Sequence, residues 1–571
     1  MTEYVVTSAK PLSEEKKRRI IQELNADLSS VTFLVDEALV GGIVISDGKR
    51  VLDASVRGKL RGAAEAAKKR VYGKPLEHIL DELKAEFASF EKKNEKVDAG
   101  VIRSVTDGVI FVEGLPDAKV SELLWVEEKY FAMVMNLNAD SVGAILLTGQ
   151  SEVRAGDLAR CTGRIVTVPV GKALLGRVLD PLGAPIDGLG EIQAESFRRA
   201  ESPAPSVFDR AKVAEPLYTG VKIIDAIVPI GKGQRELIIG DRQTGKTSIC
   251  LDAIINQKGK NVFCVYVAIG QKNSTIADFV KRLRDHGASE YTIVVAATAS
   301  DSAPLQYIAP YTATAMAEAL MYEGKDVLIM YDDLSKHAVA YRTISLLLKR
   351  PAGREAYPGD VFYVHSRLLE RSAKLADKLG GGSMTALPII ETLGSDISQY
   401  IPTNVISITD GQLFLESMLF HAGVRPAVNV GLSVSRVGGS AQCAAMRDVA
   451  KGLKLDLARY REMAIFTQFG GDVDEETKAV LDKGAKLTQM LVQPVGKPYS
   501  VADEVVEIYL TSHGAFTDVR VSDLRQELDA LLREVHAAHP EIAEEISLAG
   551  KLSAESKEAL DLMIRAYREK Q

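Results

Sequence analysis

Short apolar runs alternate with amphipathic stretches through the middle of this 571-residue chain. Such alternation predicts a largely parallel sheet covered by helices, because parallel strands need crossover connections between them. The strands are expected at residues 236–239, 262–268, 292–297, 326–331, 386–391 and 405–409. We therefore expect an α/β core over residues 195–440.

The regions before and after this core have different patterns. Between residues 97 and 194, short β-type runs separated by glycine turns predict a small β-barrel. After residue 440 nearly every segment has helical spacing, so residues 441–571 are expected to form a helical bundle. Its breaks are expected near Gly470, Pro494, Gly514 and Pro540.

The front of the chain predicts two more parts. Residues 1–72 have the pattern of a short α/β segment, and residues 73–96 have the spacing of a charged helical connector. A helix is expected from Ser13, and Asp47-Gly48 is typical of a hairpin turn. The strands of the α/β segment are expected at residues 4–7, 31–35, 39–46 and 51–54.

Composition and charge narrow the class of protein. The chain is 46% apolar and 26% charged, close to the globular average. Its net charge of −7 offers no bulk attraction to nucleic acid, so no such partner is expected. The apolar runs are shorter than the ~18 residues needed to cross a bilayer, so no transmembrane segment is expected. The cysteines lack metal-type spacing and are expected to be reduced core residues: Cys161, Cys250, Cys264 and Cys443.

The strongest chemical signal is a glycine-rich loop between a strand-like run and a helix-like run that starts at Ser248. It reads Gly240-Asp241-Arg242-Gln243-Thr244-Gly245-Lys246-Thr247. In such a loop, glycines let backbone N–H groups face phosphates, the lysine meets the outer phosphates, and the last hydroxyl ligates Mg²⁺. The sequence therefore predicts a P-loop that binds a nucleotide with Mg²⁺.

The remaining parts of such a site follow later strands. Asp332 comes first after an apolar strand, so it is the candidate to complete the Mg²⁺ shell, whereas Asp333 is expected to cap the next helix. Hydrolysis also needs a group that deprotonates or orients water. The chain has Gln271 at that place, and a glutamine cannot accept the proton at neutral pH. The residues predict binding and give no support for turnover.

Six further motifs accompany the P-loop. They are ALLGR at 173–177 with PIDG at 185–188, VAIGQK at 267–272, YDDLSK at 331–336, RPAGREAYPGD at 350–360 and IPTNVISITDGQ at 401–412. In this order they resemble the α-subunit family of F-type ATP synthases, from about Val97 to the C-terminus. The resemblance implies a RecA-like P-loop core, preceded by the β-barrel and the short α/β segment and followed by the helical bundle.

The resemblance also implies a place in a rotary assembly. In this family, α subunits alternate with β subunits in a ring around a central γ subunit, and peripheral-stalk b subunits hold the ring. The α site binds ATP or ADP with Mg²⁺ and is non-catalytic, which agrees with Gln271. The implied nucleotide-binding residues are Gly240, Asp241, Arg242, Gln243, Thr244, Gly245, Lys246, Thr247 and Ser248, with Thr247 and Asp332 at the metal.

Two further roles come from the resemblance alone. Arg436, in the motif Ser433-Val434-Ser435-Arg436-Val437, matches an arginine that reaches the catalytic site on the adjacent β subunit. Gln493 matches the first of two glutamines on the adenine side of the α site. The second would fall at residues 494–498, which contain no glutamine, so the contact with the base is expected to differ.

The first 72 residues resemble a different subunit of the same enzyme. VTSA at 6–9, PLSEE at 11–15, LVGGIVI at 39–45 and VLDASVRGKL at 51–60 look like the C-terminal part of the δ subunit, which joins the ring to the peripheral stalk. We hypothesise a natural δ–α fusion in which residues 1–72 help to dock the peripheral stalk.

The location implied is peripheral, on the cytoplasmic face of a bacterial inner membrane, with the coupling ion (H⁺ or Na⁺) left open. Two alternatives remain at this point. A self-sufficient RecA-like ring ATPase of the secretion-motor type would turn over ATP without β. A ring resembling the transcription terminator Rho would bind RNA in a salt-sensitive way, although an acidic chain with 6% aromatic residues offers no obvious stacking surface.

Overall fold

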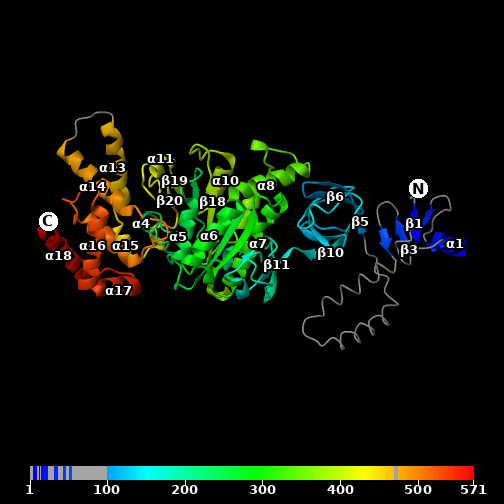
Figure 1. Cartoon of the computed structure of the whole chain (residues 1–571), viewed down its shortest axis with the longest axis horizontal. Helices are drawn as coiled ribbons and strands as arrows, with labels where there is room; N and C mark the ends of the chain where they lie inside the picture. Colours follow the sequence, from blue (N-terminus) through cyan, green and yellow to red (C-terminus); the bar gives the residue numbers. More distant parts are fainter. Residues whose placement is uncertain are drawn as a thin grey trace, which may run out of the picture. The chain divides into compact units, whose positions relative to one another are not determined.

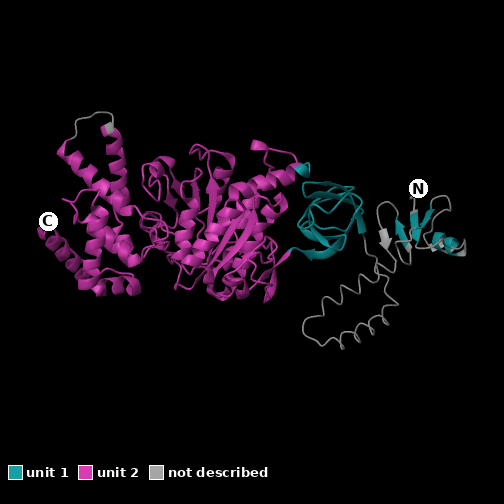
Figure 2. Cartoon of the chain, viewed as in Figure 1, with its two compact units in different colours: residues 1–166, 347–349 teal, residues 167–346, 350–571 magenta. Residues whose placement is uncertain are grey.

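The computed structural model describes residues 4–8, 12, 14–23, 31–35, 43–46, 51–53, 99–468 and 474–570 (Figure 1). The chain forms two compact units, one of residues 1–166 with 347–349 and the other of residues 167–346 with 350–571 (Figure 2). The expected turn at Asp47-Gly48, the connector at 73–96 and the break near Gly470 lie outside the described residues.

The N-terminal residues of the first unit form a four-stranded sheet with the order β2-β1-β3-β4. β1 pairs parallel with β2 and antiparallel with β3. The helix α1 (Glu14–Glu23) lies between β1 and β2 in sequence, as the crossover of a parallel pair requires. Each strand overlaps an expected one: β1 (Tyr4–Ser8), β2 (Val31–Val35), β3 (Ile43–Ser46) and β4 (Val51–Asp53).

The same unit contains a closed six-stranded barrel in the order β10-β5-β6-β9-β8-β7. Its strands are β5 (Ala99–Thr106), β6 (Val109–Glu113), β7 (Glu122–Val126), β8 (Tyr130–Leu137), β9 (Val142–Leu146) and β10 (Leu158–Ile165). The barrel therefore ends well before residue 194. β11 (Thr167–Val170) pairs with β13 (Ser196–Arg199) in the second unit, a pairing between distant segments that local patterns do not reveal.

The second unit is built on an eight-stranded sheet with the order β12-β16-β15-β17-β18-β14-β19-β20. All neighbours are parallel except β19 and β20. β14 and β17 are almost wholly buried, as expected for parallel strands covered on both faces. The strands are β12 (Val178–Leu179), β14 (Leu237–Gly240), β15 (Val262–Gln271), β16 (Thr292–Thr298), β17 (Asp326–Asp332), β18 (Ser383–Glu391), β19 (Gly411–Leu415) and β20 (Val434–Ser435).

Helices connect these strands. The α-helices are α4 (Lys222–Ile227), α5 (Lys246–Ile255), α6 (Asn273–Asp285), α7 (Ala303–Tyr322), α8 (Leu334–Leu347), α9 (Val361–Leu369), α10 (Tyr400–Ile408) and α11 (Ser417–His421). Short 3₁₀ turns are η4 (Lys172–Leu174), η5 (Val207–Asp209), η6 (Ser289–Tyr291), η7 (Arg354–Ala356), η8 (Asp377–Leu379) and η9 (Gly438–Ala441).

One expected strand is wrong. Residues 405–409 belong to the helix α10 and its C-terminal cap, although their β-branched side chains favour a strand. The buried positions Ile401, Val405 and Ile408 follow helical spacing, so packing against the core outweighs local propensity. Pro402 is tolerated because it lies in the first helical turn.

The C-terminal region is helical, as expected, and shares a hydrophobic core with the sheet region. Met446, Leu487 and Val505 join Ile224 and Ile238 in one buried cluster. Within the described residues, no helix combines the length and apolar character needed to cross a bilayer. The helices are α12 (Ala444–Val449), α13 (Leu453–Gln468), α14 (Glu475–Leu491), α15 (Val501–Ser512), α16 (Leu524–Ala538), α17 (Pro540–Ala549) and α18 (Ala554–Lys570).

Candidate nucleotide site and exposed arginine

The expected P-loop connects a buried strand to a helix. β14 ends at Gly240 and α5 begins at Lys246. Between them, Gln243 and Gly245 have left-handed backbones, with φ of 61° and 93°. The loop therefore turns sharply just before the N-terminus of α5, where unpaired N–H groups favour an anion.

The two loop glycines have different surroundings. A Cβ atom on Gly240 would lie 2.4 Å from the carbonyl oxygen of Leu415, so a larger residue would force the strands apart. A Cβ atom on Gly245 would meet only the ring of Phe420, at 3.8 Å. The space at Gly245 is thus open, and the loop has the form of a phosphate cradle.

Lys246 lies buried at the base of the loop, with 7% of its surface exposed. Its ammonium donates to the carbonyl oxygens of Gly240 and Asp241 over 2.9 and 2.6 Å. Burial lowers the pKa of Lys246, and nearby carboxylates, Glu391 foremost, oppose this shift. A phosphate would offer this ammonium a charged acceptor, which binds more strongly than a carbonyl.

Asp332, the last residue of β17, collects three hydrogen bonds although it is only 3% exposed. Its Oδ2 accepts from the hydroxyls of Thr247 and Tyr266 over 2.7 and 2.8 Å. Its Oδ1 accepts from the side-chain amide of Gln271 over 2.9 Å. A hydroxyl and a carboxylate placed together, as in Thr247 and Asp332, are the hard oxygen ligands that Mg²⁺ prefers.

Asp333 has a structural role, as the sequence predicted. Its Oδ1 accepts from the backbone N–H of Lys336 over 2.8 Å, which caps α8. The Lys336 ammonium lies 3.1 Å from the other oxygen. Burial raises the pKa of Asp333 to about 6.

Asp241 anchors the first part of the P-loop. Its Oδ1 accepts from the Thr392 hydroxyl and the Ser395 N–H, over 2.7 and 2.8 Å. Its Oδ2 accepts from the hydroxyls of Ser395 and Ser417 over 2.9 and 3.1 Å. Burial acts against ionisation, but these hydrogen bonds prevail and lower the pKa of Asp241. Asp241 thus holds the loop and is not directed at a ligand.

The other P-loop residues are either buried, where they support the loop, or exposed. Thr244 is buried and donates to a loop carbonyl over 2.8 Å. Arg242 is exposed and donates to Glu391 over 3.0 Å, while Gln243 is exposed as well. Ser248 is half-buried in the first turn of α5.

Gln493 lies buried, with 4% of its surface exposed, and its side-chain amide is occupied by the protein. Its Oε1 accepts from the N–H of Lys222 over 3.2 Å. Its Nε2 donates to the carbonyls of Gly220 and Lys497 over 2.7 and 3.0 Å. In this arrangement, Gln493 shapes the loop at residues 492–499 instead of offering a free amide to a base.

Arg436 lies elsewhere on the core, directly after β20, which pairs with β19. Its backbone N–H donates to the Asp410 carbonyl over 2.8 Å. Its side chain is exposed, and within the described residues its guanidinium has no hydrogen-bond or ion-pair partner. The backbone is held while the charged group is exposed.

Sequence reasoning missed three buried side chains near these sites: Tyr266, Asp252 and Glu236. Glu236 accepts from Gln234 over 2.7 Å, and its other oxygen has no partner among the described residues. Burial raises the pKa of Glu236 well above its usual value, although Arg436 opposes the shift. A polar residue inside an apolar run, as with Tyr266 in Val262–Ile269, is the one local signal that could have pointed to such roles.

The phosphate cradle and the sheet that carries it define the class of this molecule, a P-loop nucleotide-binding protein. Residues 220–435 match the model of the ATP synthase alpha/beta family, nucleotide-binding domain, and residues 442–567 match the ATP synthase alpha/beta chain, C terminal domain. Residues 1–66 match the ATP synthase delta (OSCP) subunit.

Curated relatives cover most of the chain. The ATP synthase subunit alpha of Caldanaerobacter subterraneus subsp. tengcongensis is 55% identical over 494 residues, 86% of this chain and 98% of the relative. That of Clostridium acetobutylicum is 54% identical over 492 residues, 86% of this chain and 97% of the relative. The chain belongs to the ATP synthase alpha subunit family, and a delta-type segment precedes its alpha-type part. The predicted family and the predicted δ–α fusion are confirmed, and the secretion-motor alternative is not favoured.

Proposed function

We propose that this alpha-type subunit holds ATP or ADP with Mg²⁺ at its own P-loop without hydrolysing it, and that Arg436 completes the catalytic site of an adjacent β subunit. The observation that carries the first part is the contact between Gln271 and Asp332. The amide of Gln271 is committed to the carboxylate, and it has no basic group with which to take a proton from water.

The residues around the P-loop support nucleotide binding. Residues 240–248 would meet the phosphates through backbone N–H groups and through Lys246. Thr247 and Asp332 would hold Mg²⁺, which would neutralise charge on the phosphates. The loop at 492–499, shaped by Gln493, would lie on the base side.

Arg436 supports the second part of the proposal. A guanidinium stabilises negative charge on a transferring phosphoryl group when its backbone is rigid and its head is unpaired. Arg436 has both features, because β20 fixes its backbone and its side chain is exposed. It would therefore act during ATP synthesis or hydrolysis in a neighbour's site, coupled to H⁺ or Na⁺ transport.

The proposed partners are β and γ subunits and the b subunits of a peripheral stalk, with the enzyme on the cytoplasmic face of a bacterial inner membrane. The delta-type segment would meet the stalk. β2 is an edge strand of its sheet, and Leu34 and Val35 expose 50% and 52% of their surfaces there. Edge strands with apolar side chains favour pairing with a partner. A map of the assembled enzyme with residues 1–66 away from every stalk chain would contradict this docking.

The test of the nucleotide site is ATP binding and phosphate release by the purified full chain, first alone and then with β. We expect saturable binding of Mg-ATP by the chain alone, without release of phosphate. Lys246→Gln should weaken binding by more than about tenfold, since the ammonium is the only side-chain cation proposed to meet the outer phosphates. Turnover by the chain alone would reject the non-catalytic assignment and favour a self-sufficient motor.

A further inference from the structure

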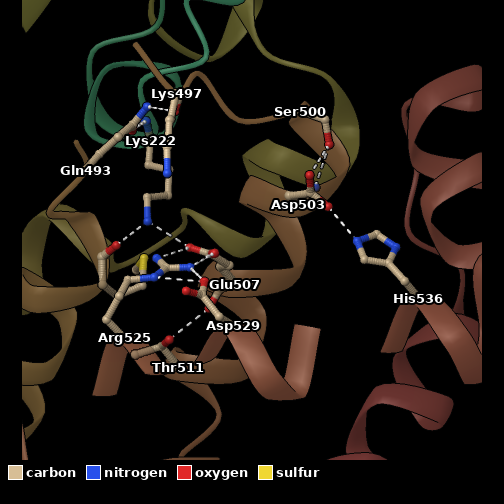
Figure 3. Close-up of polar contacts among 11 residues, drawn as sticks. Lys222, Gln493, Lys497, Ser500, Asp503, Glu507, Thr511, Arg525, Asp529 and His536 are labelled. Atoms are coloured by element: carbon tan, nitrogen blue, oxygen red, sulfur yellow. Dashed lines mark hydrogen bonds and ion pairs between the residues drawn. The ribbon is translucent and has the colours of Figure 1, made fainter. Parts of the chain in front are cut away.

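Lys222, in the first turn of α4, carries a fully buried ammonium. Its Nζ lies 2.8 Å from Oε2 of Glu507 and also donates to the backbone carbonyl of Met490. The ring of Tyr499 lies 4.5 Å from the same ammonium. Figure 3 shows the ammonium pointing toward Glu507, with Gln493 and Lys497 near the other end of the side chain.

Glu507 is fully buried too, and Arg525 supports it from the far side. Arg525 donates to Oε1 of Glu507 over 2.6 Å and to Asp529 over 2.9 Å. Glu504, one turn earlier on α15, makes no side-chain hydrogen bond among the described residues, and burial raises the pKa of its carboxyl well above the usual value.

The Lys222 contacts converge on one end of the loop at residues 492–499. Met490 is the penultimate residue of α14, so the ammonium meets a carbonyl at a helix C-terminus, where a cation is favourable. The backbone N–H of Lys222 holds the Gln493 side chain, which in turn holds Gly220 and Lys497. The loop ends at Ser500, which caps α15 by accepting from the N–H of Asp503.

This loop is tied to the P-loop region on two sides. The N–H of Gly496 donates to Asp252 of α5 over 2.7 Å, and α5 begins in the P-loop. The N–H of Gln493 donates to the carbonyl of Arg425, whose guanidinium lies 4.3 Å from the ring of Phe420. Phe420 is the side chain nearest to the open space at Gly245.

We propose that Lys222 and Glu507 are positioning residues for the base-binding side of the nucleotide site, because they hold the loop at residues 492–499 in one conformation beside α5. The inference rests on the nucleotide site proposed above. A pre-formed loop raises affinity for the base because less conformational freedom is lost on binding. The phosphates are held mainly by the P-loop, so their binding should depend less on this loop.

Stability alone does not account for this pair. Two buried charges in a protein interior are often no more stabilising than apolar residues of similar size. Charge-assisted hydrogen bonds do fix geometry closely, and here they fix a helix end and a loop that lie more than 260 positions from Lys222 in sequence.

The test compares two probes on the purified full chain: Mg-ATP, which has a base, and Mg-tripolyphosphate, which has none. The main variant is Lys222→Met with Glu507→Met, since removing both charges together leaves neither one unpaired. We expect its affinity for Mg-ATP to fall about tenfold and its affinity for tripolyphosphate to change less than about twofold. Urea unfolding should show a variant at least as stable as the parent chain.

Lys486→Met is the matched control. Lys486 is also a buried lysine of this helical region, and it bonds Asp482 and the carbonyl of Thr517 over 2.6 Å each, away from the loop. The Lys486→Met variant should keep the parent chain's preference for Mg-ATP over Mg-tripolyphosphate. If the double variant folds poorly, Arg525→Met provides the second test, because it weakens the support of Glu507 while Lys222 and Glu507 stay in place, and it should shift the preference in the same direction.

The outcomes separate the two proposals. In the folded double variant, an unchanged ratio of the affinities for Mg-ATP and Mg-tripolyphosphate would overturn the positioning role, whether or not both affinities fall. If Lys246→Gln leaves both affinities unchanged, the nucleotide site itself is wrong.

Discussion

The side-chain amide of Gln271 donates to Oδ1 of Asp332 over 2.9 Å, while Thr247 and Tyr266 donate to Oδ2. Three neutral donors thus surround one carboxylate. The proposed metal ligand is therefore oriented by the protein itself.

Gln271→Glu would place a second carboxyl against Asp332. Two carboxylates at hydrogen-bonding distance share a proton, because the ionisation of both is opposed by their mutual repulsion. We expect the variant's Mg-ATP affinity to rise with pH as the shared proton leaves, since a doubly charged pair attracts Mg²⁺ more strongly. Titration calorimetry from about pH 6 to about pH 8 checks this. Gln271→Met, which adds no charge, should show the same pH dependence as the parent chain; a Glu variant with that flat profile would contradict the expectation.

Arg436→Ala should affect a neighbour's chemistry and leave this chain's own site intact. In the complex with β, we expect ATP turnover to fall about 10³-fold, the typical effect of removing an arginine finger. Mg-ATP affinity of the chain alone should not change. Arg459→Ala removes another exposed arginine, from α13, and is the control for surface charge. Turnover that survives in the Arg436 variant would remove the proposed role.

Asp252 should make stability depend on pH. Burial raises the pKa of Asp252 to about 6, above the unfolded value of about 4. The folded state thus holds the proton more tightly, so this carboxyl favours folding below about pH 4, and the contribution is lost as the pH rises through about 6. Asp252→Asn keeps an acceptor for the N–H of Gly496 and should flatten the fall in unfolding free energy over that range by about 3 kcal/mol.

Urea unfolding at a series of pH values measures this effect. The exposed Asp518, replaced by Asn, is the control, and its variant should follow the parent curve. Parallel curves for the parent chain and the Asp252 variant would show that Asp252 does not titrate in this range.

Glu318 joins two arginines inside the second unit. It accepts from Arg371 over 2.6 and 2.8 Å and from Arg198 over 3.0 Å, and both Glu318 and Arg371 are 1% exposed. Glu318→Ala should lower the unfolding free energy by about 3–5 kcal/mol, because it leaves Arg371 charged and unpaired in the core. Glu318→Leu with Arg371→Met should recover most of the loss in urea unfolding. A double variant as unstable as the single one would mean that lost packing is the cause.

The parts of the site that could be predicted from sequence are those set by local chemistry. The P-loop has fixed spacing between its glycines, lysine and hydroxyl, and Asp333 caps the helix that it directly precedes. The parallel sheet could also be predicted, because the alternation of strand-like and helix-like runs is a local pattern as well. The helix at residues 400–408 escaped prediction because burial of Val405 and Ile408 outweighs their β propensity.

The contacts that could not be predicted join distant segments. Lys222 and Glu507 lie 285 positions apart, and neither is unusual in its own surroundings. The side chain of Gln493 was expected to face a base, yet backbone groups occupy it. Such pairings depend on how the helical region packs on the sheet, which no local pattern contains.

The four residues of β14 lie between Glu236 and the P-loop. Glu236, whose carboxyl lies close to Gly411 opposite Ser435, directly precedes the strand, and the P-loop follows its end. Four residues of extended chain span roughly 13 Å, and this strand is bonded on both sides. The start of the P-loop therefore cannot move independently of β18 and β19, the two strands that are hydrogen-bonded to β14.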